Sequence, residues 1–160
     1  MATDFFLKID TIPGESKDAK HKDEIDVLSW SWGASQTGGF AYGGGGGAGK
    51  VSMQDFHFTM RVNKSTPKLI LACANGQHIP KAVLTIRKAG KEQQEFLKYT
   101  FSDLLISSYQ TGGSDGMDIP TESVSFNYSK MEVEYKEQDQ KGGLVGTVKA
   151  HWDMKTNTGG

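Results

Sequence analysis

The stretch SVSFNYSKMEVEYK, residues 123–136, decides the fold because its alternation changes register partway along. Its apolar side chains stand at even positions up to residue 128 and at odd positions from residue 131: Val124, Phe126, Tyr128, Met131, Val133 and Tyr135. Successive side chains of a β-strand point to opposite faces, so a period of two is typical of a strand. The change of register within one extended run predicts a β-bulge or bend near Ser129 and Lys130.

The same period of two recurs through most of the chain. In QDFHFTMRV (54–62), the apolar side chains share even positions: Phe56, Phe58, Met60 and Val62. In FLKYTFSDLLISSY (96–109), apolar side chains at odd positions predict a long, bent strand: Leu97, Tyr99, Phe101, Leu105 and Tyr109. Shorter strands are expected at residues 4–9, 25–35, 81–88 and 145–152.

One segment has helical periodicity instead. STPKLILACANG (65–76) offers Ser65 or Thr66 as the N-cap, Pro67 at the first helical position and Asn75-Gly76 as the stop. These signals predict a helix at about 66–75. The side chains expected to face a core are Leu69, Ile70, Cys73 and Ala74, with Cys73 acting as a small buried hydrophobe rather than a reactive thiol.

Together these elements predict one mainly β domain, residues 1–160. Seven or more strands and one short α-helix fit an antiparallel β-barrel or sandwich. Two of the connections are long and rich in glycine, residues 36–50 and 109–120. A third, residues 12–24, is rich in charge, and we expect its carboxylates and His21 to lie on a solvated face.

Composition excludes several classes of protein. The formal net charge is −1, from 18 basic and 19 acidic residues, without the basic stripe that is typical of nucleic-acid binders. The sequence contains no basic amphipathic helix, so we expect no direct insertion into a membrane. The amino terminus lacks the apolar run of a signal peptide, and the single Cys73 suits a reducing compartment, so we expect synthesis in the cytoplasm.

GGGGAGKV (44–51) nearly matches a phosphate-binding loop, since Gly44, Gly49 and Lys50 fall in register with G-x-x-x-x-G-K-[ST]. That loop needs a hydroxyl after the lysine to ligate magnesium, and Val51 has none. It also needs a helix leaving the loop, whereas the residues that follow alternate as a strand. A nucleotide hydrolase is therefore the weakest of the functions we consider.

Other candidate reaction centres fail in the same way. GGSDG (112–116) matches the G-x-S-x-G pattern around Ser114, but a nucleophile elbow leads into a helix and this stretch leads into another strand. No two of the four histidines are spaced as a ligand pair on one element: His21, His57, His78 and His151. The sequence therefore predicts a protein that is not an enzyme and that has no catalytic, cofactor or metal site.

The glycines of residues 36–50 need another explanation. A long loop with backbone freedom suits a segment that lies against a neighbouring subunit, with Phe40 and Tyr42 as anchors. The candidate interface comprises these two rings together with Gly43, Gly44, Gly45, Gly46, Gly47 and Lys50. The alternative is a hairpin connection with no partner.

Five segments, in order, give the chain a family resemblance: GESKD (14–18), DEIDVLSWSWG (23–33), LACANG (71–76), IRKAG (86–90) and SSYQTGG (107–113). They closely resemble the haemolysin-coregulated protein (Hcp) family, which forms the inner tube of the bacterial type VI secretion system. The resemblance implies a closed or nearly closed β-barrel subunit with one helix, assembled as a six-membered ring. It also implies stacked rings, a surrounding contractile sheath, a spike protein at the tip, and effector proteins held in the lumen. Export then uses the type VI apparatus without a signal peptide.

The resemblance also points to the residues that would contact effectors. In DVLSWSWG (26–33), Leu28, Trp30 and Trp32 share one face, which we expect the core to claim, while Ser29 and Ser31 share the other. The resemblance places this strand along the inner wall of the ring, so Ser31 and Ser29 would line the lumen. The chain ends at MKTNTGG, so we expect no fused toxin domain. A different reading is a monomeric all-β binding module that uses Trp30 and Trp32 as a platform.

Overall fold

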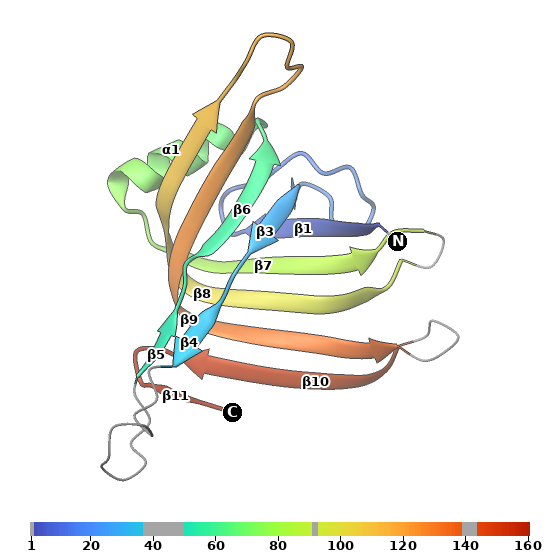
Figure 1. Cartoon of the computed structure of the whole chain (residues 1–160), viewed down its shortest axis with the longest axis vertical. Coiled ribbons are helices and arrows are strands. Elements are labelled where there is room, and N and C mark those ends of the chain that lie inside the picture. The colour runs from blue at the N-terminus through green and yellow to red at the C-terminus, as the bar shows by residue number, and fades with distance from the viewer. Residues whose placement is uncertain (1, 37–49, 91–92, 139–143) are drawn as a thin grey trace.

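The computed structural model describes residues 2–36, 50–90, 93–138 and 144–160. Within these residues, eleven strands and one helix follow one another (Figure 1): β1 (Thr3–Ile9), β2 (Ile25–Asp26), β3 (Ser29–Ser31), β4 (Ala34–Gln36), β5 (Val51–Met53), β6 (Phe56–Arg61), α1 (Thr66–Asn75), β7 (Ile79–Lys88), β8 (Glu95–Gly112), β9 (Thr121–Gln138), β10 (Leu144–Asp153) and β11 (Thr158–Gly159). The described chain is thus mainly β with one short helix, as the sequence predicts.

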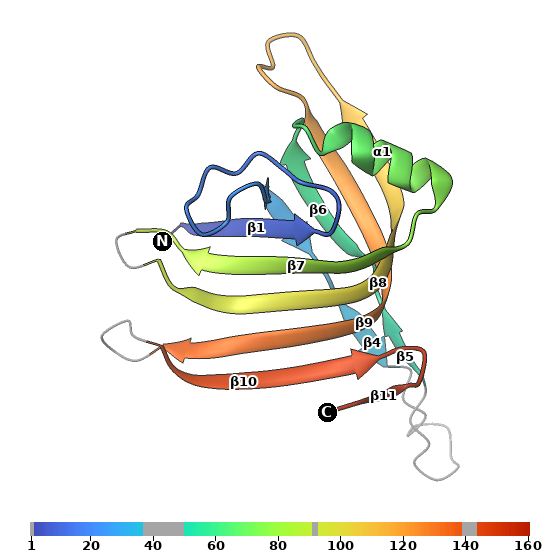
Figure 2. The ribbon, with the colours of Figure 1, turned by 180° about the vertical axis from the view of Figure 1, so that it is seen from behind.

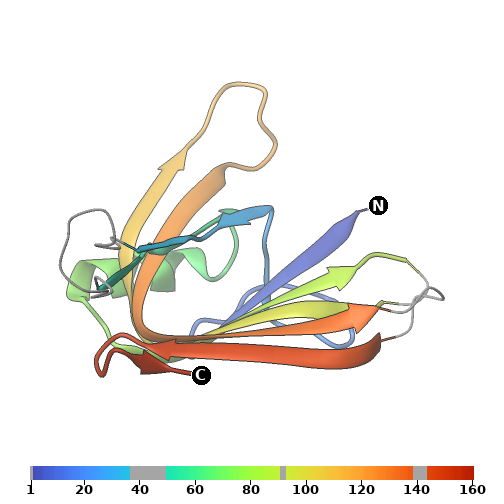
Figure 3. The ribbon, with the colours of Figure 1, turned by 60° about the horizontal axis from the view of Figure 1, so that its bottom comes forward.

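The long strands β8 and β9 belong to both layers of the molecule. In one layer the strand order is β11-β10-β9-β8-β7-β1-β2, and all pairs are antiparallel. In the other layer the far ends of β8 and β9 continue into β6 and then β3. Figure 3 shows β8 and β9 turning together out of the first layer.

The change of register in β9 lies at this turn. β9 pairs with β6 through residues 121–126 and with β10 through residues 130–138, so it changes partner between these two stretches. Tyr128 and Met131 are both buried, which confirms the predicted bend near Ser129 and Lys130. The bulge that accompanies it is in the neighbouring strand, where the register shifts between Ile106 and Ser108.

The core fills the space between the layers. Four phenylalanine rings lie at its centre, each at most 1% exposed: Phe56, Phe58, Phe101 and Phe126. α1 lies against β8 (Figure 2) and contributes Leu69 and Ala72 to the core. The helix ends at Gly76, whose left-handed backbone (φ 66°) costs glycine no strain.

Two details of the predicted helix were wrong. Ile70 is 45% exposed and Ala74 is exposed, while Cys73 is half-buried against the core. The helix therefore buries a narrower face than the positions of its apolar residues predict. The N-cap residue is Ser65, one of the two predicted, but it forms no side-chain cap bond, and its hydroxyl donates to Asn63 Oδ1 at 2.6 Å instead.

The predicted strand at 25–35 was wrong in its continuity, because the segment forms three short strands. Val27 N donates to Phe5 O of β1, whereas Leu28 N donates to Thr59 O of β6, so the segment changes layers between these residues. Its side-chain register changes there as well. Val27 is buried and Leu28 is 40% exposed, which corrects the expectation that Leu28 faces the core.

A closed barrel is not what the described strands form. The pairing runs from β2 through β1, β7, β8, β9 and β6 to β3. Its two ends, β2 and β3, follow one another in the segment 25–35. The residues between these ends bond to other strands, Val27 to β1 and Leu28 to β6, and within the described residues β2 and β3 do not pair with each other. β4 and β5 form a separate two-stranded sheet.

A similar register change corrects the prediction for residues 96–109. The strand is long and bent, as expected, but Leu104 and Ile106 are buried in place of Leu105. Asp103 has a positive φ of 56° within the strand, directly before the change. The loop between β8 and β9 is also shorter than predicted, because β8 extends to residue 112.

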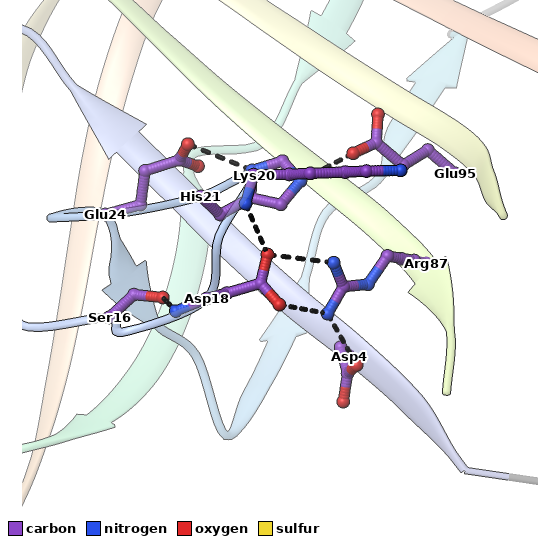
Figure 4. A network of polar contacts seen from close by, with 8 residues as sticks. All are labelled: Asp4, Ser16, Asp18, Lys20, His21, Glu24, Arg87 and Glu95. Carbon is purple, nitrogen blue, oxygen red and sulfur yellow. Dashed lines mark hydrogen bonds and ion pairs between the residues drawn. The ribbon is translucent and has the colours of Figure 1, made fainter. Parts of the chain in front are cut away.

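The charged connection at residues 12–24 is not solvated at its centre, which corrects the expectation for His21. His21 is 7% exposed, and its ring stacks on Phe6 with a centroid separation of 4.4 Å. Its Nδ1 lies 2.9 Å from Glu24 Oε2 and its Nε2 lies 2.6 Å from Glu95 Oε1 (Figure 4). The loop is folded back because distant strands supply partners for its polar side chains.

Arg87 of β7 binds the same loop through Asp18. Its guanidinium donates to both oxygens of Asp18, at 2.9 and 2.8 Å, and to Asp4 Oδ2 at 3.1 Å (Figure 4). These bonds lower the pKa of Asp18 to about 2 and raise the pKa of Arg87. The charges lie close to the aromatic core, since the guanidinium carbon is 4.7 Å from the centre of the Phe6 ring.

Candidate functional surface

The predicted serines lie on the outward side of the layer built from β3, β6, β9 and β8. Alternation in these strands turns their aromatic and aliphatic side chains to the core and leaves small polar ones outside. Strand register then aligns the outward residues in two cross-strand rows: Ser29, Thr59, Ser123 and Gln110 in the first, and Ser31, His57, Ser125 and Ser108 in the second. We call these eight residues the polar face.

Hydroxyl groups of the polar face bond to one another. Ser29 Oγ and Thr59 Oγ1 are 2.6 Å apart, and Ser125, 3% exposed, bonds to the hydroxyls of Ser107 and Ser108. Ser31 and Ser123 are exposed and form no side-chain hydrogen bond within the described residues. The face therefore consists of short polar side chains, and the hydroxyls of Ser31 and Ser123 are available to donate hydrogen bonds to a partner.

A shallow depression occupies the middle of the polar face. Its volume is about 400 Å³, and its lining consists of Ser29, Trp30, Ser31, His57, Phe58, Thr59 and Ser123. Short side chains from three strands form its floor. A second depression of about 230 Å³ adjoins it, since Thr59 and Ser123 line both.

The two tryptophans of the same segment point the other way. Trp30 stacks on Phe56 at 6.2 Å and meets Phe5 edge-on. The indole N–H of Trp32 donates to the Tyr128 hydroxyl, which donates to Gln54 O at 2.8 Å. Both rings pack against the core, as predicted, and so do not form the exposed platform that a binding module would need.

The remaining predicted positions are separate from the polar face or undescribed. Phe40, Tyr42 and Gly43–Gly47 lie outside the described residues. Lys50 is exposed and leads into β5, a strand rather than the helix of a phosphate loop. Ser114 is exposed in the loop between β8 and β9, with no helix after it.

His57 is the residue of this surface that sequence reasoning missed. As a metal ligand it has no partners, because in the described part of the chain no three His, Cys, Asp or Glu side chains converge on one point. The signal was present in QDFHFTMRV, where alternation puts His57 opposite the phenylalanines. Only strand pairing shows that its neighbour is Ser31.

These features define a class of protein: a mainly β subunit whose candidate site is an exposed polar sheet face. No helix among the described residues is long and apolar enough to cross a membrane. Comparison with known proteins narrows the class, because residues 6–135 match the family described as type VI secretion system effector, Hcp. The chain belongs to the Hcp family, the tube proteins of type VI secretion.

Individual relatives agree over nearly the whole length. The chain is 52% identical to protein hcp1 of Pseudomonas aeruginosa over 98% of both chains. Among solved structures, a type six secretion system protein superposes with a TM-score of 0.93 at 34% identity, covering 99% of this chain and all of the other. Hcp1 from Salmonella typhimurium superposes with a TM-score of 0.82 at 42% identity, covering 99% of each.

Proposed function

We propose that the chain assembles into a six-membered ring, that rings stack into a tube, and that the polar face lines the lumen and holds effector proteins. Family membership supports the assembly, and the polar face supports the lumen. An inner wall must stay hydrated when empty and leave room when occupied, and a surface of short polar side chains, most of them exposed, satisfies both needs.

The observation that carries the lumen assignment is the opposite orientation of neighbouring side chains in β3. Ser29 and Ser31 are exposed, while Trp30 between them packs on the core. Ser31 and Ser29 are therefore the effector contacts that we propose. A side chain that faces solvent in one subunit is available to a partner in the ring.

The tube would also meet other proteins of the apparatus. We propose that residues 36–50, including Phe40, Tyr42, Gly43–Gly47 and Lys50, contact an adjacent ring or subunit. A spike protein at the tip and a contractile sheath outside are the further partners. The protein would be made in the cytoplasm and leave through the type VI apparatus, with no nucleic acid or cofactor involved.

Size-exclusion chromatography with light scattering tests the assembly first. We expect a particle of six chains, and electron micrographs of its peak fraction should show rings. A monomer at every concentration would contradict the proposal and favour a monomeric binding module.

Enzymatic assays test the non-enzyme part separately. We expect no ATP or GTP hydrolysis and no esterase activity above the buffer rate. The variants Lys50→Ala and Ser114→Ala should hydrolyse these substrates no faster or slower than the wild type, at the buffer rate. A hydrolytic rate that either variant abolishes would contradict the proposal.

A further inference from the structure

The polar face contains one ionisable side chain among its hydroxyls and its single amide. His57 is exposed, and neither of its ring nitrogens is hydrogen-bonded within the described residues. It lies directly across from Ser31 on β3 and from Ser125 on β9. An imidazole at the centre of a surface otherwise built from uncharged groups can distinguish ligands by charge.

We propose that His57 determines which cargo the depression accepts, by selecting carboxylate groups. The inference rests on the proposed function, because it assigns a chemical preference to the surface that would line the lumen. Two hydroxyls with no partner among the described residues and one ring line the depression and can donate hydrogens: those of Ser31, Ser123 and His57. The Ser29–Thr59 pair shares one hydrogen bond and so has one further hydrogen to donate. An ionised carboxylate only accepts hydrogen bonds, so it fits such a set of donors.

The charges around His57 favour the same ligand. Along its own strand, His57 and Arg61 share the outward face, and Arg61 is exposed. Asp55 precedes β6 on that face and remains charged, but its carboxylate accepts from Ser107 Oγ at 2.7 Å and does not line the depression. The facing residues of β3, β9 and β8 are Ser31, Ser125 and Ser108, which are not ionisable. No carboxylate lines the depression, so an acidic group entering it meets no like charge there.

The preference should depend on pH. Histidine gains its proton between about pH 8 and 5, and only the protonated ring donates from both nitrogens and carries a charge. A carboxylate ligand stays ionised throughout this range. Binding of a carboxylate should therefore tighten as the pH falls from 8 to 6, whereas binding of an uncharged amide should change little.

Three short peptides test the proposal on the chain itself, with no need for an identified effector. They are acetyl-hexaglutamate amide, acetyl-hexaglutamine amide, and acetyl-hexaglutamine with a free carboxyl terminus. Titration is followed by NMR through the His57 ring signals and the amide signals of Ser31 and Ser123, at pH 6 and pH 8. We expect hexaglutamate to bind about two- to fivefold more tightly at pH 6, the range of an exposed ion pair.

Two variants separate His57 from general charge effects. In His57→Gln, hexaglutamate should lose the pH dependence while the fold persists, since residue 57 is exposed. His151→Gln changes an exposed histidine on β10, in the other layer, and should bind like the wild type. Tight binding of the free-acid hexaglutamine at pH 6 would support the same chemistry, with a chain terminus as its source.

The proposal is overturned if hexaglutamate and hexaglutamine amide bind equally at pH 6, or if His57→Gln retains the full pH dependence. Sizing of the same samples keeps this outcome apart from a failure of the proposed function. Rings without carboxylate selection would refute the role of His57 alone. A monomer that still selects carboxylates would refute the ring and leave the chemistry of His57 standing.

Discussion

At the scale of single residues, the molecule depends on polar contacts between side chains that are distant in sequence. Arg87, 2% exposed, donates to both oxygens of Asp18, which lies in a loop 69 positions away. A buried guanidinium is costly to leave unpaired, so these bonds explain why a loop of charged residues folds back on the sheet. His21 is likewise buried and bound by polar partners, since its ring nitrogens contact Glu24 in the same loop and Glu95 on β8.

Asp18→Asn should therefore lower stability and change its dependence on pH. The pKa of Asp18 is about 2 in the folded chain, against an ordinary value of 3.8. Because the folded pKa is the lower one, its contribution is complete above about pH 4 and is lost as the pH falls through about 2. We expect the free energy of unfolding in urea at pH 7 to fall by about 1–3 kcal/mol. The variant should also lose less stability than the wild type between pH 4 and pH 2.

Asp23→Asn is the matched control in the same loop. Asp23 is exposed, and its contact with Lys64 is long, at 3.8 Å with both side chains 52% exposed. Its positive φ of 63° is one that asparagine tolerates. This variant should stay within about 0.5 kcal/mol of the wild type. Equal losses in both variants would show that the Asp18–Arg87 pair has no special weight.

At the scale of strands and helices, the sequence predicts an element well where that element keeps one partner. The helix and the strands at 4–9, 81–88 and 145–152 are found within a few residues of their expected bounds. Errors occur where a strand changes partner. Alternation continued through a corner places Leu28 in the core and Leu105 on the same face as Phe101, because apolar residues occupy both registers there.

The candidate surface shows the same limit. Ser29 and Ser31 could be predicted as outward from alternation alone, since each neighbours a tryptophan that the core claims. His57 could not be placed beside Ser31, because the two are 26 positions apart and only strand register brings them together. The buried state of His21 was equally hidden, because Glu95 is 74 positions away.

Tyr128 gives a test at the scale of the bend in β9. Its hydroxyl receives the Trp32 N–H and donates to Gln54 O, so it joins the bend to the segments on either side of the small β4–β5 sheet. Tyr128→Phe leaves both groups without that partner. We expect the free energy of unfolding to fall by about 1–3 kcal/mol in urea titrations. Tyr135→Phe, at a ring 45% exposed, should change it by less than about 0.5 kcal/mol, and a larger effect there would contradict the explanation.

At the scale of the whole molecule, the glycine-rich loop provides a test of ring stacking. Deleting Gly43–Gly47 should leave the subunit folded, because the deletion is flanked by the paired strands β4 and β5. Tube length in electron micrographs and the secreted fraction should both fall. Replacing the five glycines by five serines keeps the length and should retain more of both. Unchanged tubes and secretion in the deletion variant would count against a role in stacking.

The lumen itself is tested by Ser31→Gln. Ser31 is exposed on β3 and lines the depression of the polar face, so a longer side chain remains in solvent and fills the space that cargo would use. We expect an intact ring by light scattering and a fall of about tenfold in the effectors that co-purify from the secreting cells, the loss of about 1.4 kcal/mol of binding. Thr147→Gln makes a similar change at an exposed hydroxyl on β10 and should retain its cargo. Full cargo retention in an intact Ser31→Gln ring would refute the lumen assignment, and a ring that falls apart would place Ser31 at a contact between subunits instead.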